Sequence, residues 1–417
     1  MFPPLPPPDP DIRMRGFARR VMVETALQWV DEQASCLPFE AIAATAAASR
    51  VLSETVVSAV QVPLFARSMM DGFAVQAADT DGATPYNRLP LRIVGESLPG
   101  QPFTQTVLPG EAVRIMTGAP LPKGADAVLP VERTDVDRTA LFALDPVSPA
   151  KNVGRAGEDV EIGAELLRPG RILRPQDLGL LAAVGQAHIH VVQRPKVRIV
   201  ITGNELLSAG EMPRDCQIVD SNGPMLAALV ERDGGVAINP GIVPDDPSQI
   251  LAALQDAVDV VLVSGGSSVG QEDHAPRLLA QLGELAIHGI AMRPSSPAGM
   301  GRIGERLVFL LPGNPVSCLC AYDFFAGRAI RKLGGRSPEW PYRRRSLTLS
   351  RKLVSQVGRV DYARVRIVGD AVEPLAISGA SLLSSTVIAD GFVIVPGNSE
   401  GYPPGATVEV YLYDAAY

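Results

Sequence analysis

Between residues 195 and 333, short aliphatic runs alternate with amphipathic segments, and this alternation constrains the fold more than any other feature of the chain. The run Val260–Val263 is entirely β-branched or aliphatic, which is typical of a buried parallel strand. The predicted strands are Val197–Thr202, Val236–Val243, Val260–Val263, Ala286–Met292 and Leu307–Leu311, and the predicted helices are Ser221–Arg232, Pro247–Ala257, Asp273–Leu282 and Pro315–Leu333. Strands and helices in this order predict a doubly wound α/β sheet, which binds ligands at the carboxyl ends of its strands.

The regions on either side of residues 195–333 show a different sequence pattern. Residues 61–157 and 341–417 consist of short apolar runs separated by Gly, Pro and Asp, which indicates small β-rich domains. Residues 15–60 favour two helices, Arg15–Gln33 and Phe39–Leu52, and residues 158–193 favour a helix followed by a strand. The fold class expected is therefore multidomain α/β and β. We expect a disordered tail (1–14), a discontinuous mixed α/β domain I (15–60 plus 158–193), a β-rich domain II (61–157), an α/β domain III (194–340) and a β-barrel-like domain IV (341–417).

The charge balance excludes several classes of function. The 417 residues include 38 Lys and Arg against 45 Asp and Glu, a net charge of −7, which argues against a general surface for nucleic acid or anionic membrane. The chain lacks a run of about 18 apolar residues, and its N-terminus does not resemble a signal peptide. Four cysteines without a C-x-x-C pair form neither a disulfide framework nor a structural zinc site. We expect a cytoplasmic protein in which any anion site is local.

The segment Ser264–Asp273 follows a predicted strand and opens a predicted helix. Gly265 and Gly266 would let backbone N–H groups approach a ligand closely, and a helix N-terminus favours an anion. The segment lacks the Gly-Lys-Ser/Thr ending of a P-loop. The alternative interpretation is an ordinary glycine-rich turn.

A second strand–turn–helix junction lies at Leu311–Ser317. Its turn could present the backbone amides of Gly313 and Asn314 and the hydroxyl of Ser317 to a phosphate or to a pterin edge. A purely structural junction fits these residues equally well.

Three acidic residues, Glu205, Asp245 and Asp273, each follow a predicted strand of the same sheet. Alone, Glu205 could be a surface acid and Asp245 a helix cap. Because the carboxyl ends of parallel strands share one edge, the three together favour a divalent metal, and oxygen-only ligands suit Mg²⁺. Asp71 and Thr117 lie in turn-like segments of residues 61–157, and alone each is best interpreted as structural.

Taken together and in order, these segments resemble the molybdopterin molybdenumtransferase family (MoeA, and the C-terminal module of gephyrin). The resemblance spans roughly residues 20 to 415, and each segment alone is weakly specific. The matching segments are Pro63–Ala74, Arg114–Glu132, Gly154–Val160, Val197–Leu206, Asp220–Leu226, Val243–Pro247, Val263–Asp273 and Leu311–Ser317.

The resemblance implies an enzyme of molybdenum cofactor biosynthesis. Members of the family insert molybdate into adenylylated molybdopterin with the help of Mg²⁺ and release AMP. They form homodimers of four-domain subunits, with each site between domain III of one subunit and the first domains of the other. The resemblance also implies contact with other proteins of cofactor biosynthesis and with apo-molybdoenzymes.

The resemblance also assigns roles to residues of this chain. Asp71, Thr117 and Asp159 would face the partner's site, while Glu205, Asp245 and Asp273 would handle the metal and the adenylate. Asp159 would be a further metal ligand. The residues implied to bind the pterin, adenylate or oxyanion are Gly265, Gly266, Ser268, Arg293, Pro312, Gly313, Asn314, Ser317, Arg359 and Ser384.

The chain departs from the family pattern at residues 293–297. Where the family usually has Lys-Pro-Gly-Lys-Pro, this sequence has Arg-Pro-Ser-Ser-Pro, so one cation is kept as Arg293 and the second is replaced by Ser296. Arg binds oxyanions through a planar fork and is not equivalent to Lys. The departure leaves a second hypothesis open, a paralogue that binds molybdopterin or finished cofactor for delivery or modification without inserting metal.

Overall fold

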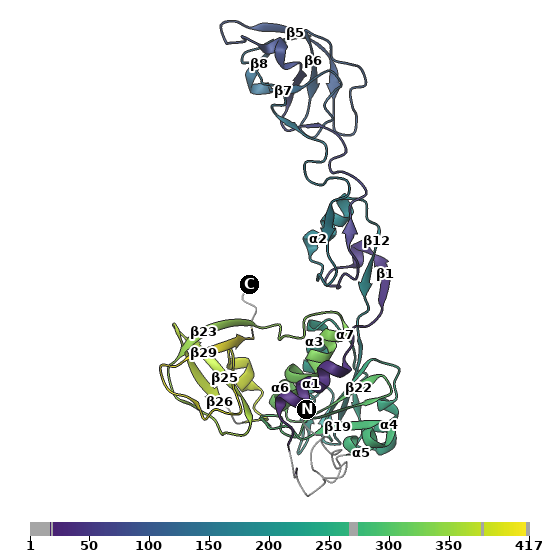
Figure 1. Cartoon of the computed structure of the whole chain (residues 1–417), viewed down its shortest axis with the longest axis vertical. Helices are drawn as coiled ribbons and strands as arrows, with labels where there is room; N and C mark the ends of the chain where they lie inside the picture. Colours follow the sequence, from purple (N-terminus) through teal and green to yellow (C-terminus); the bar gives the residue numbers. More distant parts are fainter. Residues whose placement is uncertain (1–16, 18–19, 267–273, 377–378, 414–417) are drawn as a thin grey trace. The chain divides into compact units, whose positions relative to one another are not determined.

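A computed structural model describes residue 17 and residues 20–266, 274–376 and 379–413. By internal contacts the chain divides into two compact units. Unit 1 comprises Met1–Glu40, Ser49–Val51 and His190–Tyr417, and unit 2 comprises Ala41–Ala48 and Leu52–Ile189. The chain crosses between the units within strands β1 (Phe39–Ala43) and β12 (His188–Val192), which are labelled in Figure 1, and also on each side of Ser49–Val51. The division into four domains stays a prediction.

Unit 1 contains the predicted α/β sheet, which has seven strands. The parallel part is β16 (Val236–Ile238), β13 (Lys196–Thr202), β18 (Val260–Ser264) and β22 (Arg306–Leu311), with β17 (Ile242–Val243) also paired to β13. The antiparallel strands β21 (Gly299–Ile303) and β19 (Glu284–His288) complete one edge. A second, parallel pair, β14 (Leu206–Leu207) and β15 (Ile218–Val219), lies beyond the end of β13.

Helices cover both faces of the sheet, as a doubly wound fold requires. Alternate residues of each strand enter two different hydrophobic clusters: in β13, Ile199 and Ile201 join one and Val200 joins the other. The first face packs against α1 (Val23–Gln33), α3 (Asn222–Arg232) and the continuous helix formed by α6 (Pro315–Ala321), a π-helical turn (Tyr322–Ala326) and α7 (Gly327–Leu333). The second face packs against α4 (Pro247–Leu254) and α5 (Ala275–Leu282).

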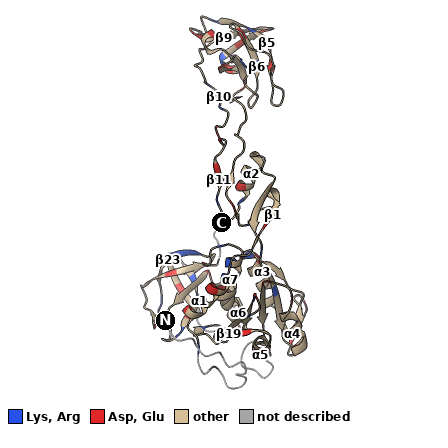
Figure 2. Ribbon diagram, turned by 45° about the vertical axis from the view of Figure 1, so that its right-hand side comes forward, with Lys and Arg blue, Asp and Glu red and all other residues tan. Residues whose placement is uncertain are grey.

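The C-terminal part of unit 1 is a β-barrel, as the sequence predicts. Five strands close on themselves in the order β25 (Val360–Val368), β26 (Ala371–Ala376), β23 (Arg343–Leu349), β29 (Thr407–Leu412) and β27 (Gly391–Val395), which pairs again with β25. The short strand β20 (Met292–Arg293) adds to β25 in parallel, with Arg293 opposite Asp361. A helical turn, α8 (Ser384–Ile388), and the pair β24 (Leu353–Val354) and β28 (Gly401–Tyr402) complete this part. The basic run Arg343–Arg345 is exposed on β23 (Figure 2).

Unit 2 is mainly a six-stranded sheet, which confirms the β character expected of residues 61–157. The strand order is β7 (Ala127–Pro130), β4 (Gly72–Val75), β6 (Glu111–Ile115), β5 (Leu89–Ser97), β9 (Ala140–Ala143) and β8 (Thr134–Asp137). Two small antiparallel pairs, β3 (Arg67–Ser68) with β10 (Val153–Gly154) and β2 (Val56–Val57) with β11 (Glu165–Leu167), and the helix α2 (Pro175–Ala183) complete it.

Four predicted elements are wrong in detail. The helix predicted over Arg15–Gln33 begins at Val23 as α1, because the backbone of Val21 pairs with Gly289 and Ala291 instead. The predicted helix Phe39–Leu52 is instead strand β1 and a 3₁₀ turn, Ala44–Ala46, because pairing with β12 outweighs the helix propensity of alanine. The predicted strand Val236–Val243 is interrupted between β16 and β17, and Ala286–Met292 is divided between β19 and β20, in different sheets. In the part of the chain that the structure covers, no helix is long and apolar enough to cross a membrane.

Candidate functional site

A pocket of about 660 Å³ lies at the carboxyl ends of β13, β18 and β22, where the sequence places its motifs. We call it the strand-end pocket. Its lining is formed by Ile201, Thr202, Gly203, Glu205, Leu206, Ile218, Val219, Asp220, Ser221, Asn222, Asp245, Ser264, Gly265, Gly266, Pro297, Pro312, Gly313, Asn314, Pro315 and Ser381. The structure therefore brings Glu205, Asp245, Gly265, Gly266 and the turn Pro312–Asn314 together.

Two glycine turns form one side of the strand-end pocket. Gly265 has φ of +100°, and a Cβ there would lie 2.2 Å from the carbonyl oxygen of Thr202, so only glycine fits. A Cβ on Gly313 would lie 3.6 Å from the Cα of Gly265, so the two turns are in close approach. Asn222 links them, because its side-chain amide donates to Ser264 Oγ at 2.9 Å and to the Gly313 carbonyl at 2.7 Å. This places backbone groups of both turns beside the same space.

Asp245 and Asp246 are adjacent in sequence but have different roles. Asp245 accepts hydrogen bonds from the hydroxyl of Thr202 and, at 3.1 Å, from the backbone N–H of Asn204. The next residue, Asp246, caps α4 by accepting from the N–H groups of Ser248 and Gln249. The hydroxyl of Ser248 also donates to it, and this bond, followed by those from the backbone, lowers the pKa of Asp246. Because Asp246 makes the cap, the cap interpretation of Asp245 is wrong, and Asp245 belongs to the pocket.

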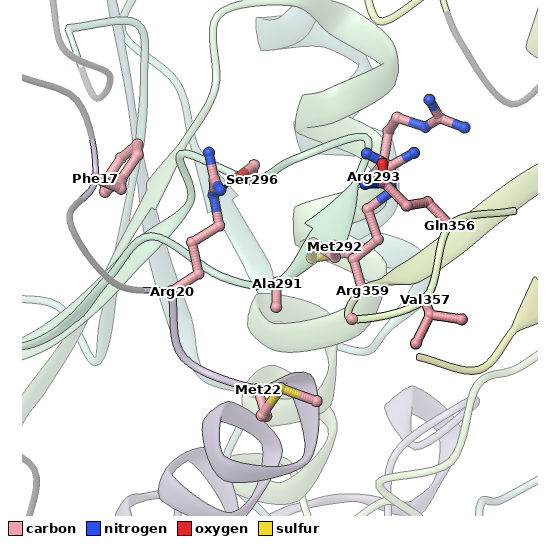
Figure 3. A pocket seen from close by; sticks show the side chains of 11 residues that line it. Phe17, Arg20, Met22, Ala291, Met292, Arg293, Ser296, Gln356, Val357 and Arg359 are labelled. Carbon is pink, nitrogen blue, oxygen red and sulfur yellow. Dashed lines mark hydrogen bonds between the residues drawn. The ribbon is translucent and has the colours of Figure 1, made fainter. Parts of the chain in front are cut away.

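A second pocket of about 410 Å³ lies beside α1, β20 and the start of β25, and Figure 3 shows it from close by. We call it the arginine pocket. Its lining is formed by Phe17, Arg20, Met22, Ala291, Met292, Arg293, Ser296, Gln356, Val357, Gly358 and Arg359. Figure 3 shows Arg20 and Ser296 on one side, and Arg293, Gln356 and Arg359 on the other.

A fully buried carboxylate organises two of these arginines. Asp361 accepts from Arg359 Nε at Oδ1, at 3.0 Å, and from Arg293 Nη2 at Oδ2, at 3.2 Å. The hydroxyl of Ser355 also donates to Oδ2, at 2.8 Å. Both Arg293 and Arg359, which the sequence singles out, are thus held in one pocket through a residue that it does not.

The segment Arg293–Pro297 contributes to both pockets. Arg293 and Ser296 line the arginine pocket, whereas Pro297 lines the strand-end pocket. Ser295, which lies between Arg293 and Ser296 in the sequence, has φ of +85°, a conformation that favours glycine. Its buried hydroxyl donates to the carbonyl of Ser317 at 2.6 Å. The two pockets therefore share one stretch of backbone.

In unit 2, Asp71 and Thr117 form a pair at adjacent strand ends. Both the backbone N–H and the hydroxyl of Thr117 donate to Asp71 Oδ1, at 2.7 and 2.8 Å. These hydrogen bonds, the backbone one first, lower the pKa of Asp71, which is exposed. Asp159 is also exposed in unit 2, where its backbone N–H donates to the carbonyl of Val62.

Comparison with known proteins identifies the family. Residues 21–185 match "MoeA N-terminal region (domain I and II)", residues 198–332 match "Probable molybdopterin binding domain", and residues 346–413 match "MoeA C-terminal region (domain IV)". A molybdopterin biosynthesis protein of Methanocaldococcus jannaschii is 33% identical, over 95% of this chain and 96% of that protein. The chain belongs to the MoeA family.

Other members are similarly close to this MoeA-family chain. Molybdopterin molybdenumtransferase 2 of Mycobacterium tuberculosis is 37% identical over 79% of this chain and 83% of its own length. The crystal structure of a molybdopterin biosynthesis MoeA protein from Pyrococcus horikoshii has a TM-score of 0.80 at 32% identity, and the match covers 95% of this chain and all of that one. The resemblance stated from the motifs is confirmed.

The donor set of the strand-end pocket of this MoeA-family protein is suitable for Mg²⁺. Glu205 and Asp245 line the same pocket, and Mg²⁺ typically uses one or two carboxylates together with water and substrate phosphates. Among the residues that the structure covers, no group of three or more His, Cys, Asp or Glu side chains that could hold a metal ion is found. Two other predicted site residues, Ser268 and Asp273, lie outside the described residues.

The remaining predicted site residues lie apart from the two linings. Ser317 is buried in the first turn of α6, and Ser384 is exposed at the start of α8. Their roles stay predictions, as does that of Asp159. The polar residues of the sites that were missed from the sequence include Arg20, Asp220, Asn222 and Asp361. Asn222 lies within the matching segment Asp220–Leu226, and Asp361 is two residues beyond Arg359, but nothing in the sequence connects Arg20 with residues 293–297.

Proposed function

We propose that this MoeA-family protein inserts molybdate into adenylylated molybdopterin and releases AMP, with Mg²⁺ assistance. The observation that carries the proposal is the adjacency of two pockets of different chemistry across the segment Arg293–Pro297. One offers glycine turns and carboxylates, and the other offers guanidinium groups. Two anionic substrates that must react with each other need such neighbouring sites.

The strand-end pocket suits the adenylylated pterin. Close approach of Gly265 and Gly313 leaves room for phosphate oxygens near backbone donors, and strand ends of doubly wound sheets are their usual ligand sites. Glu205 and Asp245 would hold Mg²⁺, which would neutralise phosphate charge near the phosphoanhydride. The hydrogen bonds from Thr202 and Asn204 orient the carboxylate of Asp245 for this role.

The arginine pocket suits molybdate, which is a tetrahedral dianion. Arginine binds such groups through two parallel N–H donors, and Arg293 and Arg359 are both held in place by Asp361. When molybdate joins the two thiol groups of the pterin, two Mo–S bonds form and one Mo–O bond breaks. The displaced oxygen leaves as water with the two thiol protons. Water then cleaves the phosphoanhydride, which releases AMP.

The proposal includes a homodimer in the cytoplasm, in which Asp71 and Thr117 of one subunit face the site of the other. Family membership supports it. So does the exposure of Met69, Met70 and Met116 beside this pair, at 51%, 38% and 48%, because exposed apolar side chains that cluster are typical of an interface. Light scattering coupled to size exclusion measures the mass in solution. A monomer at all concentrations would contradict this part of the proposal.

The decisive experiment is an assay of the purified protein with adenylylated molybdopterin, molybdate and Mg²⁺. AMP release and formation of finished cofactor, both dependent on molybdate, are expected. If neither product forms while the substrate stays intact, the proposed reaction is wrong.

A second function has one specific observation in its favour. Ser296 stands where the family usually has a second cation, which could weaken molybdate handling while leaving pterin binding intact. The protein would then bind molybdopterin or finished cofactor and deliver or modify it. Tight binding of finished cofactor without turnover in the same assay would favour this alternative over insertion.

A further inference from the structure

Val21, just before α1, is fixed against the segment Gly289–Ala291, which leads to Arg293. The backbone N–H of Val21 donates to the carbonyl of Gly289 at 2.9 Å, and the N–H of Ala291 donates to the carbonyl of Val21 at 2.8 Å. The ring of Phe17 packs edge-on against His288 with centroids 5.0 Å apart. A Cβ on Gly289 would lie 2.4 Å from the Phe17 ring, so glycine is what allows this close approach. Arg20 therefore projects from a position held on both sides.

Arg20 differs from the other two arginines of the arginine pocket in its partners. Arg293 and Arg359 both form ion pairs with Asp361, which is fully buried. Within the described part of the chain, no carboxylate pairs with Arg20, and its Nε donates to the hydroxyl of Ser296 at 2.7 Å. A guanidinium has five N–H donors, and most of those on Arg20 have no partner among the described residues, so a ligand could use them.

The arginine pocket has more positive than negative charge. Among the described residues, three arginines share one carboxylate, and Arg20 is the one for which no ion pair is found there. In a protein of net charge −7, three guanidinium groups around one cavity, with a single carboxylate paired to them in the described structure, attract an anion locally. Arg20 is exposed, so its guanidinium is accessible to a ligand that enters from solvent. The hydrogen bond to Ser296 holds this guanidinium beside the cavity (Figure 3).

We propose that Arg20 is an oxyanion-binding residue, which the N-terminal segment adds to the arginine pocket from the side opposite Arg293 and Arg359. The inference rests on the proposed function for the identity of the oxyanion. Arg20 donates to Ser296, which stands where the family usually has its second lysine. Arg20 therefore brings a cation to the point where Ser296 does not supply one. The chemistry is that of a tetrahedral dianion, which is either molybdate itself or a phosphate of the pterin substrate.

The test is steady-state kinetics of Arg20→Gln in the insertion assay, with each substrate varied in turn. We expect the KM for molybdate to rise about 10- to 100-fold, as for loss of a charged hydrogen bond, with kcat nearly unchanged. Arg343→Gln is the matched control, because Arg343 is exposed on β23 and lines neither pocket. It removes the same charge from the protein without affecting the site.

A rescue variant separates binding from a structural role. Adding Ser296→Lys to Arg20→Gln returns a cation to the same side of the pocket, and we expect it to recover most of the lost molybdate affinity. Arg20→Lys should lose less than Arg20→Gln, because it keeps the charge without the fork. If only the KM for adenylylated molybdopterin rises, Arg20 binds the pterin phosphate and the oxyanion role still holds.

Two results distinguish the failures. If wild-type protein turns over and Arg20→Gln has the same KM values as Arg343→Gln, Arg20 is not a ligand-binding residue, although the proposed function stands. If wild-type protein shows no turnover, equilibrium dialysis with molybdate alone replaces the assay. The proposal is supported if the wild-type protein binds molybdate, Arg20→Gln loses this affinity and Arg343→Gln keeps it. Equal affinity for molybdate in all three proteins would overturn the proposal.

Discussion

The two pockets of unit 1 share one stretch of backbone and have opposite electrostatics. The strand-end pocket has three carboxylates, Glu205, Asp220 and Asp245, and among its described lining residues there is no Lys, Arg or His. The arginine pocket has three guanidinium groups and no carboxylate in its described lining. An acidic protein can thus bind anions in two ways. Backbone donors with a metal serve one pocket, and arginines anchored on a single buried acid serve the other.

The largest effect expected is on stability, from Asp361→Asn. Asp361 is fully buried and paired with Arg293 and Arg359, and breaking a buried ion pair from one side costs about 3–5 kcal/mol. Urea unfolding measures the loss. Asp135→Asn is the control, since its ion pair with Arg88 is more than half exposed and should contribute below about 1 kcal/mol. Equal losses for the two variants would mean that Asp361 does not anchor the arginine pocket.

The next effect concerns the strand-end pocket and activity. Asp245→Asn keeps the size of the side chain but removes the charge that would hold Mg²⁺, so we expect turnover to fall by at least about 100-fold. Raising the Mg²⁺ concentration should restore part of the activity. Asp246→Asn is the control one residue away, and asparagine also caps helices well. A normal Mg²⁺ dependence in Asp245→Asn would remove Asp245 from the metal site.

Gly265→Ala tests whether the strand-end pocket depends on its glycine turn. The new Cβ would lie 2.2 Å from the Thr202 carbonyl at φ of +100°, so we expect a loss of about 1–3 kcal/mol and weaker pterin binding. Gly304→Ala has the same kind of φ, +60°, but nothing within 4 Å of the added Cβ. Thermal unfolding and pterin titration of both variants separate the effect of the clash with Thr202 from the effect of the positive φ, because only Gly265→Ala has the clash. The turn would not be restrictive if both variants behaved alike.

The smallest effect is a pKa change at Asp71, an acid that is hydrogen-bonded but has no cation beside it in the described structure. Thr117→Val removes the hydroxyl donor, so the lowered pKa of Asp71 should rise toward its ordinary value. With a lowered folded-state pKa, the stabilisation exists above the ordinary carboxyl pKa and is lost as the pH falls through the lowered value. Carboxyl NMR titration follows this, and Thr117→Ser should retain the wild-type pKa. An unchanged pKa in Thr117→Val would show that the backbone N–H alone sets it.

Much of the fold could be predicted because its signals are local. The residues of Val260–Val263 are enough to predict a strand, and Pro315 is enough to predict where a helix begins. The glycine at 265 and the acid at 245 could be placed at one sheet edge, because parallel strands bring their ends together. The helix predicted over Phe39–Leu52 failed because its structure depends on β12, about 150 residues away in the chain.

Arg293 and Arg359 were predicted as binding residues, but their assembly with Arg20 and Asp361 into one pocket could not be predicted, for the same reason. Arg20, Arg293 and Asp361 are far apart in sequence and meet only through the backbone bonds of Val21 and the pairing of β20 with β25. The loss of a cation at Ser296 is visible in the sequence, but its neighbour Arg20 is visible only in the structure.

The parallel pairing of β20 with β25 has a consequence for evolution and for protein engineering. Arg293 stands opposite Asp361 in that register, and a shift of one residue would turn one of them to the other face of the strand. A chimaera that receives its barrel from another member of the family must therefore bring an acid in register with residue 293. Inheritance of the barrel and inheritance of the Arg293–Pro297 segment are linked, so the two should vary together among descendants.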